Sequence, residues 1–316
     1  MPYIRFQLND TNTLTYLRFM KNLKLKLLAT AMLCSSYGLM AQSFYVTTNV
    51  GYALGMTKVN GFVNNTTYSS KYDPNTGKNT TLRSYDDVPL SLGNGFNFGI
   101  SGGYFFNQYL GVELGLNYLI GGETKLTYSY ETAWLNPDNT IRTEQRLSTQ
   151  KLSSNMFRIL PSIVITPGFE KLNPYLKMGV VIGFGNILLV SESNVTTNDT
   201  LVLLNHTVEE IKFFGGLAFG FQGTIGADYG INEKIKIFAE ANYLGYSYAP
   251  SKAEVIKYEL NGTDNLPNLS ESEKKYELLD SYTEDGTFNR DEPSKLTKIG
   301  FPYGSMSFNL GIKLLF

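Results

Sequence analysis

The C-terminal stretch decides the predicted fold: residues 304–316 read Gly-Ser-Met-Ser-Phe-Asn-Leu-Gly-Ile-Lys-Leu-Leu-Phe. Large apolar side chains occupy every second position, and the positions between them are small or polar except at Leu315. Since successive side chains of a β-strand point to opposite faces, this alternation predicts a strand with one apolar face. That face comprises Met306, Phe308, Leu310, Ile312, Leu314 and Phe316. So regular an apolar face is typical of a barrel wall that contacts lipid.

The composition favours a membrane β-barrel over a helical membrane protein. Charged residues make up 17% of the chain and aromatic residues 14%, whereas soluble domains carry roughly 25% charged residues. Mean hydropathy is nevertheless slightly negative. Helical membrane spans need about 20 consecutive apolar residues, but in a barrel only alternate residues face lipid. The formal net charge of -1 gives no reason to expect a nucleic-acid partner.

The N-terminal part of the chain predicts export. Residues 20–41 begin with closely spaced lysines, continue with an apolar stretch and end in Leu-Met-Ala, which is the pattern of a secretory signal peptide. We expect cleavage between Ala41 and Gln42, which leaves residues 42–316 as the barrel domain. We interpret residues 1–19 as an extension from a start codon placed too early. The only cysteine, Cys34, lies inside the signal, so the mature chain has none for a disulfide or a metal site.

Eight segments of the mature chain share the period-two pattern. Short connections alternate with long polar ones, as expected for the periplasmic turns and extracellular loops of an outer-membrane barrel. We therefore predict an all-β fold: a single eight-stranded antiparallel up-and-down transmembrane barrel with four long extracellular loops. The predicted strands are 44–54, 96–106, 109–120, 156–165, 175–187, 213–227, 235–246 and 304–316, and the predicted long loops are 56–95, 121–155, 188–212 and 247–300.

A soluble ligand-binding barrel is the alternative fold, with the apolar faces inside and the other faces in water. A solvated surface carries about a quarter to a third charged residues. The second faces of the predicted strands are instead mostly Gly, Ala, Ser, Thr and Asn. Small residues of this kind suit a narrow lumen, which favours the membrane barrel.

The sequence resembles the outer membrane protein β-barrel domain family, in particular its small OmpA-, OmpX- and OmpW-like transmembrane domains. The resemblance rests on Leu110-Gly-Val-Glu-Leu-Gly-Leu-Asn-Tyr118, Asn173-Pro-Tyr-Leu-Lys-Met-Gly179 and Phe238-Ala-Glu-Ala-Asn-Tyr243. In addition, Asn309, Gly311, Leu314 and Phe316 are similar to the C-terminal signal that the barrel assembly machinery reads. The resemblance implies a bacterial outer-membrane location, delivery by periplasmic chaperones and contact with lipid and lipopolysaccharide. It implies no particular activity.

Inward-facing charges form the candidate site inside the predicted barrel. Glu113, Lys177, Glu240 and Lys313 fall at similar predicted heights, and Arg158 falls higher. Charges in a narrow lumen are costly unless they pair. We interpret the five residues as a charge cluster that fills the lumen, and a gate or ion path is the alternative.

The sequence predicts a structural or anchoring protein whose surface loops interact with other molecules, without enzyme activity, cofactor or metal. A channel for small or hydrophobic solutes is the first alternative. The second is a lipid-modifying enzyme, which would use a histidine beside a serine at the lipid-facing rim; the only histidine, His206, falls in a predicted loop. The acidic stretch of the fourth loop lacks the spacing of a calcium-binding EF-hand, and we interpret it as solvated and partly disordered.

Overall fold

The fold is almost entirely β-strand. The computed structural model describes residues 43–56, 64–88, 90–138, 140–197, 203–283 and 289–316. The predicted extension 1–19, signal segment 20–41 and cleavage site between Ala41 and Gln42 lie outside these residues. Within the described ranges, helix is limited to the 3-10 turn η1 (Leu266–Asn268) and to α2 (Glu271–Lys274). Neither helix of this part of the chain has the length and apolar character needed to cross a membrane.

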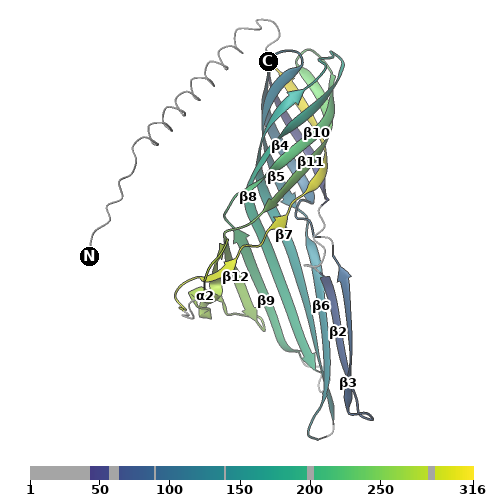
Figure 1. Ribbon diagram of the computed structural model, residues 1–316, viewed down its shortest axis with the longest axis vertical. Coiled ribbons are helices and arrows are strands. Elements are labelled where there is room, and N and C mark those ends of the chain that lie inside the picture. The colour runs from purple at the N-terminus through teal and green to yellow at the C-terminus, as the bar shows by residue number, and fades with distance from the viewer. Residues whose placement is uncertain (1–42, 57–63, 89, 139, 198–202, 284–288) are drawn as a thin grey trace, which may run out of the picture.

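Antiparallel strands pair in a closed ring, and this ring forms the barrel in the upper half of Figure 1. Among the described residues, its eight members in order around the wall are β1 (Ser43–Gly55), β4 (Gly95–Phe105), β5 (Leu110–Gly121), β7 (Ile141–Ile165), β8 (Leu172–Thr197), β10 (Ala218–Gly230), β11 (Ile235–Tyr248) and β17 (Ser305–Leu315). The C-terminal strand β17 closes the ring, because it pairs with β11 on one side and with β1 on the other. These pairings confirm the predicted all-β antiparallel barrel.

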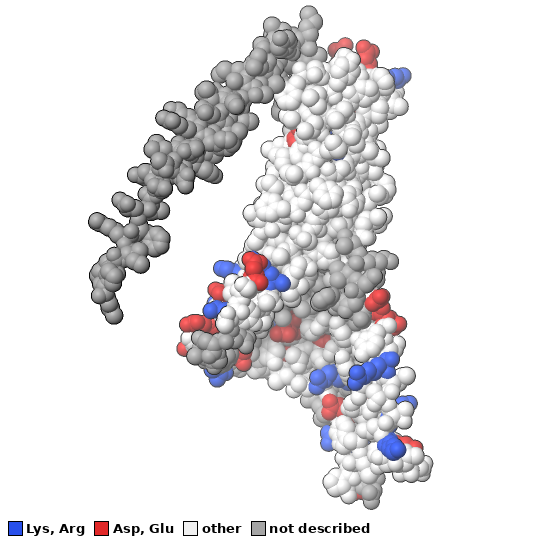
Figure 2. Space-filling model, viewed as in Figure 1, with Lys and Arg blue, Asp and Glu red and all other residues white. Residues whose placement is uncertain are grey.

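Side chains alternate across the barrel wall as the sequence predicts. Along β5, exposed and buried positions alternate from Leu110 to Ile120. Leu114 on the outer face is 53% exposed, whereas the neighbouring Glu113 on the inner face is 8% exposed. On the face shown in Figure 2, the outer wall is nearly free of charged side chains. An apolar outer face with a polar inner face is the arrangement of a barrel that stands in lipid.

The long connections are the main departure from the prediction, because they form strands that prolong the wall far beyond the barrel (Figure 1). The strands β7 and β8 run for 25 and 26 residues and pair with each other along this extension. The added strands are β2 (Asn64–Asp73), β3 (Lys78–Asp87), β6 (Thr124–Leu135), β9 (Leu203–Phe214) and β12 (Lys252–Leu260). We call these strands, with the outer parts of β7 and β8, the flare.

The fourth predicted loop is also largely folded in its described part. It contains β12, β13 (Thr263–Asp264), η1, α2, β14 (Lys275–Leu279) and β15 (Ser294–Thr297), and β16 (Phe301–Pro302) follows it. The strand β12 pairs with β9 and with β14, so this segment forms a shelf beside the end of the barrel (Figure 1). The acidic side chains of this stretch are mostly exposed to solvent, as predicted, but the segment is folded, so its interpretation as a partly disordered loop is corrected for the described residues.

A further correction concerns the predicted strand 213–227, which the structure divides into β9 and β10. Both parts pair with β8, and the break falls at residues 215–217. Gly215 and Gly216 have φ angles of 77° and 78°, and a Cβ on Gly216 would lie 2.8 Å from the carbonyl oxygen of Ala249. Glycine tolerates this backbone because it has no Cβ. The break lets β9 leave the barrel wall and join the flare.

Candidate functional site

Three inward charges meet in the lumen, each from a different strand. Lys177 of β8 places its Nζ 2.9 Å from Glu113 Oε1 of β5 and 3.1 Å from Glu240 Oε2 of β11. All three side chains are less than 10% exposed. One ammonium group therefore bridges two carboxylates across the lumen, and we call these residues the ion layer.

Neutral donors complete the coordination of the two carboxylates in the ion layer. The Tyr45 hydroxyl donates to Glu113 Oε2 at 2.9 Å. The Tyr175 hydroxyl and the Asn309 amide donate to Glu240, at 3.0 and 3.2 Å respectively. Buried ions are tolerated when both charge and hydrogen-bonding capacity are satisfied. The sequence analysis singled out neither tyrosine.

Lys313 does not join the ion layer. It pairs with Asp228 of β10, which is 1% exposed and also lies 3.2 Å from Lys236 Nζ. Sequence reasoning missed Asp228 because that segment was assigned to a short turn. One further step of the inward alternation through Gln222, Thr224 and Gly226 would have found it.

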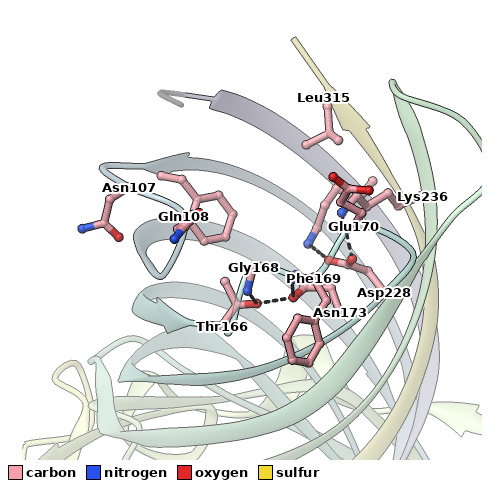
Figure 3. Close-up of a pocket in the computed structure, with 12 residues that line it drawn as sticks. Asn107, Gln108, Thr166, Gly168, Phe169, Glu170, Asn173, Asp228, Lys236 and Leu315 are labelled. Carbon is pink, nitrogen blue, oxygen red and sulfur yellow. Dashed lines mark hydrogen bonds and ion pairs between the residues drawn. The ribbon is translucent and has the colours of Figure 1, made fainter. Parts of the chain in front are cut away.

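A hollow of about 240 Å³ opens at the short-turn end of the barrel, and Asp228 is among the residues that line it (Figure 3). Its floor is the connection between β7 and β8, where the Thr166 hydroxyl donates to Asn173 Oδ1 at 2.7 Å. Asp228 and Lys236 line its wall in Figure 3. The inner end of the hollow is therefore formed by Asp228 and the two lysines that pair with it, Lys236 and Lys313.

Arg158 lies in a separate layer on the other side of the ion layer. It is 1% exposed, and its Nε donates to Asn117 Oδ1 at 3.0 Å while its Nη2 donates to Asn97 and Asn117. No carboxylate in the described part of the chain forms an ion pair with it. The space between Asn117 and the ion layer is a cavity of about 30 Å³, which has room for only about two or three waters at ~10–15 Å³ each.

The flare end of the lumen is filled by a hydrophobic cluster. The segments around residues 90–92 and 301–303 contribute Leu90, Leu92, Phe301 and Tyr303, which pack against inward side chains of the wall such as Met156. The remaining buried members are Leu119, Leu126, Leu152, Val181, Ile187, Ala218, Leu244, Tyr246 and Tyr248. The backbone holds these segments in place, since Leu92 N donates to Pro302 O at 3.0 Å.

The residues of the predicted assembly signal divide between the two faces of β17. Asn309 is buried and bonds Glu240, and a Cβ on Gly311 would lie 2.4 Å from the ring of Phe238. Leu314 and Phe316 lie on the exposed outer face. Their role in assembly stays a prediction.

His206 lies on β9 of the flare and not in a loop, which corrects its predicted position. Its Nε2 is 3.2 Å from Glu192 Oε1, and its backbone N–H donates to Asn261. Within the described residues, no group of three or more His, Cys, Asp or Glu side chains could hold a metal ion.

Comparison with known proteins gives the following matches. Residues 27–266 match the model of the outer membrane protein beta-barrel domain family. No curated protein matches the sequence. The structure is similar to the outer membrane protein OprG from Pseudomonas aeruginosa, with 13% identity, a TM-score of 0.38 and coverage of 88% of this chain and 98% of OprG. It is also similar to Neisserial surface protein A, with 12% identity, a TM-score of 0.27 and coverage of 88% and 100%. The attachment invasion locus protein Ail of Yersinia pestis matches with 11% identity, a TM-score of 0.27 and coverage of 87% and 97%.

Proposed function

The chain belongs to the outer membrane protein beta-barrel domain family and is located in the bacterial outer membrane, and we propose that its barrel is a closed anchor that holds the flare at the cell surface. In this proposal the flare, and not the lumen, interacts with other molecules. The barrel supplies a fixed position in the membrane.

The observation that carries the proposal is the obstruction of the lumen at successive levels. The ion layer bridges the lumen from three strands. Beyond it lie the cavity of about 30 Å³ and the buried Arg158. The hydrophobic cluster then fills the flare end. A solute would have to displace a buried ion layer and a packed apolar cluster, and both are costly to disrupt.

The flare supports the proposal because it offers extensive surface with polar and aromatic character. The strand β3 is exposed along its whole length. On the neighbouring strands, the rings of Tyr68 and Tyr130 lie 6.0 Å apart, and the Arg83 guanidinium lies 5.2 Å from the ring of Tyr68. Tyrosine and arginine are enriched in surfaces that bind other proteins.

Conductance measurements test the closed anchor against the channel alternative. We expect no stepwise conductance from the purified chain in planar bilayers, and no swelling of vesicles that contain it in solutions of small sugars. Insertion is checked in the same preparation by migration that differs between boiled and unboiled samples on gels. Regular conductance steps from the inserted protein would contradict the proposal.

We propose no lipid-modifying activity. The supporting observation is that the His206 ring bonds the carboxylate of Glu192 on the flare, which is not the serine partner that such an enzyme would need. Lipid A and phospholipid profiles should be the same in cells that carry the native chain and in cells that carry His206→Ala. A difference between the two profiles would favour the enzyme.

A further inference from the structure

A hollow of about 450 Å³ opens on the outer surface where the barrel wall ends and the flare begins. Its lining includes Phe184 and Asn186 of β8, Lys212 and Phe214 of β9, and Glu254 and Ile256 of β12. The hollow results from the glycine break at residues 215–217, because β9 turns away from the barrel there and takes β12 as its neighbour. We call it the rim hollow.

The rim hollow is continuous with the lipid-facing surface of the barrel. Phe184 is 43% exposed and continues the outward row that Met178 and Val180 form on β8. Further along this face come Asn186, which is paired with Phe214 of β9, and then Leu188, which is paired with Lys212, so polar side chains enter the apolar row here. Figure 2 shows charged side chains of both signs where the uncharged wall ends. The hollow therefore lies at the height of the lipid headgroups.

Lys212 and Glu254 give the rim hollow one positive and one negative charge. They are opposite each other in the pairing of β9 with β12. Within the described residues, neither side chain forms an ion pair or hydrogen bond; Lys275 of β14, which lies opposite Glu254 on the other side of β12, forms its ion pair with Glu271. Two opposite charges that lie side by side can bind a ligand that carries one negative and one positive group. Such complementary charges determine both which ligand binds and how it is oriented.

We propose that the rim hollow binds the headgroup of an outer-membrane lipid that carries a phosphate and a primary ammonium. Lys212 binds the phosphate and Glu254 binds the ammonium. The Asn186 amide donates a hydrogen bond to a phosphate oxygen, and the acyl chain packs on Phe184 and the apolar wall. This inference goes beyond the anchoring role and does not depend on it. It requires only that the barrel spans the outer membrane.

Native mass spectrometry of the full chain, released from detergent micelles with added lipid, tests the site. The probes are phosphatidylethanolamine, which has both charges, and phosphatidylglycerol, which has the phosphate alone. We expect Lys212→Gln to weaken binding of both lipids by about tenfold, which is the effect of losing one charge-assisted contact. We expect Glu254→Gln to weaken phosphatidylethanolamine by about fivefold and to leave phosphatidylglycerol unchanged or tighter.

Matched controls are Lys78→Gln and Glu144→Gln, which remove the same charges from flare strands away from the rim. Gel migration without boiling verifies that each variant is folded. The different effects expected of Glu254→Gln on the two lipids are measured in a single folded protein. This comparison therefore still tests the site if Lys212→Gln does not fold. Equal losses for both lipids in Glu254→Gln, or site variants that bind like the controls, would overturn the proposal.

Discussion

Replacing Lys177 by methionine is the most direct test of the ion layer. Lys177 is the only cation in contact with Glu113 and Glu240 among the described residues, at 2.9 and 3.1 Å. Methionine fills a similar volume but has no charge, so both carboxylates lose their counterion. The hydroxyls of Tyr45 and Tyr175 remain as donors, but neutral donors do not compensate two buried negative charges.

Removal of one partner from a buried ion pair costs about 3–5 kcal/mol. We therefore expect Lys177→Met to lower the free energy of unfolding by at least that amount, about 3–5 kcal/mol, because two carboxylates are uncovered. The matched control combines Lys177→Met with Glu113→Gln and Glu240→Gln. This triple variant has no buried charge in the layer, and its glutamine oxygens still accept from the tyrosines. We expect its stability to return to within about 1–2 kcal/mol of the native chain, since neutral replacement of a whole buried cluster is often tolerated.

Urea titration of the chain refolded into lipid vesicles measures these differences. Gel migration without boiling and far-ultraviolet circular dichroism report the folded fraction, and linear extrapolation gives the free energy of unfolding. A single variant as stable as the native chain would refute the reasoning. A triple variant as unstable as the single one would also refute it, because the loss would then come from packing and not from charge.

Three further predictions concern single residues. Gly216→Ala should destabilise the chain by about 1–2 kcal/mol, because alanine would have to adopt a left-handed backbone and its Cβ would lie close to Ala249 O. Gly223→Ala is the control and should be nearly neutral, since no atom lies within 4 Å of the added Cβ. Urea titration compares the two variants. Deletion of Phe316, which is 75% exposed on the outer face, should lower the amount of chain in the outer membrane, and normal levels would refute an assembly role. Burial raises the pKa of Glu209 in the flare. Because the folded pKa exceeds the unfolded one, protonation favours the folded flare, and its stability should fall as pH rises above the ordinary range of a carboxyl. Hydrogen exchange in β9 should accordingly be faster at pH 8 than at pH 5, relative to Glu209→Gln at each pH.

The barrel could be predicted from the sequence because lipid and lumen impose different chemistry on alternate residues. On β17 this contrast extends from Met306 to Phe316, and the observed strand, Ser305–Leu315, differs from the predicted range by one residue at each end. The family and the outer-membrane location, which the resemblance implied, were also predicted correctly. The structure also brings Glu113, Lys177 and Glu240 together, which are three of the five inward charges that the sequence singled out.

Much of the flare could not be predicted by the same method, because some of its strands meet water on both faces. The strand β3 shows the problem, since every residue from Lys78 to Asp87 is exposed. Its pairing with β2 depends on backbone hydrogen bonds and strand propensity. Neither requires apolar residues at every second position, so the sequence shows no alternating pattern there. Asp228 was missed for a different reason: it is the last inward residue of its strand, where polar composition also indicates a turn.

The pairing of β7 with β8 explains how a membrane anchor can fix the position of a surface structure. The two strands keep a single register from Ile165↔Leu176 near the short turns to Glu144↔Thr197 in the flare. At roughly 3.3 Å per residue, this ladder is about 70 Å long, whereas a lipid-facing band is only about 25 Å tall. Even with the strands tilted, a large part of the ladder must stand outside the membrane. Because the same strands contribute Lys177 and Arg158 to the lumen, the packing that closes the barrel also holds the base of the flare. Loss of the ion layer should therefore loosen the flare as well as the barrel, which hydrogen exchange of the outer parts of β7 and β8 in Lys177→Met can measure.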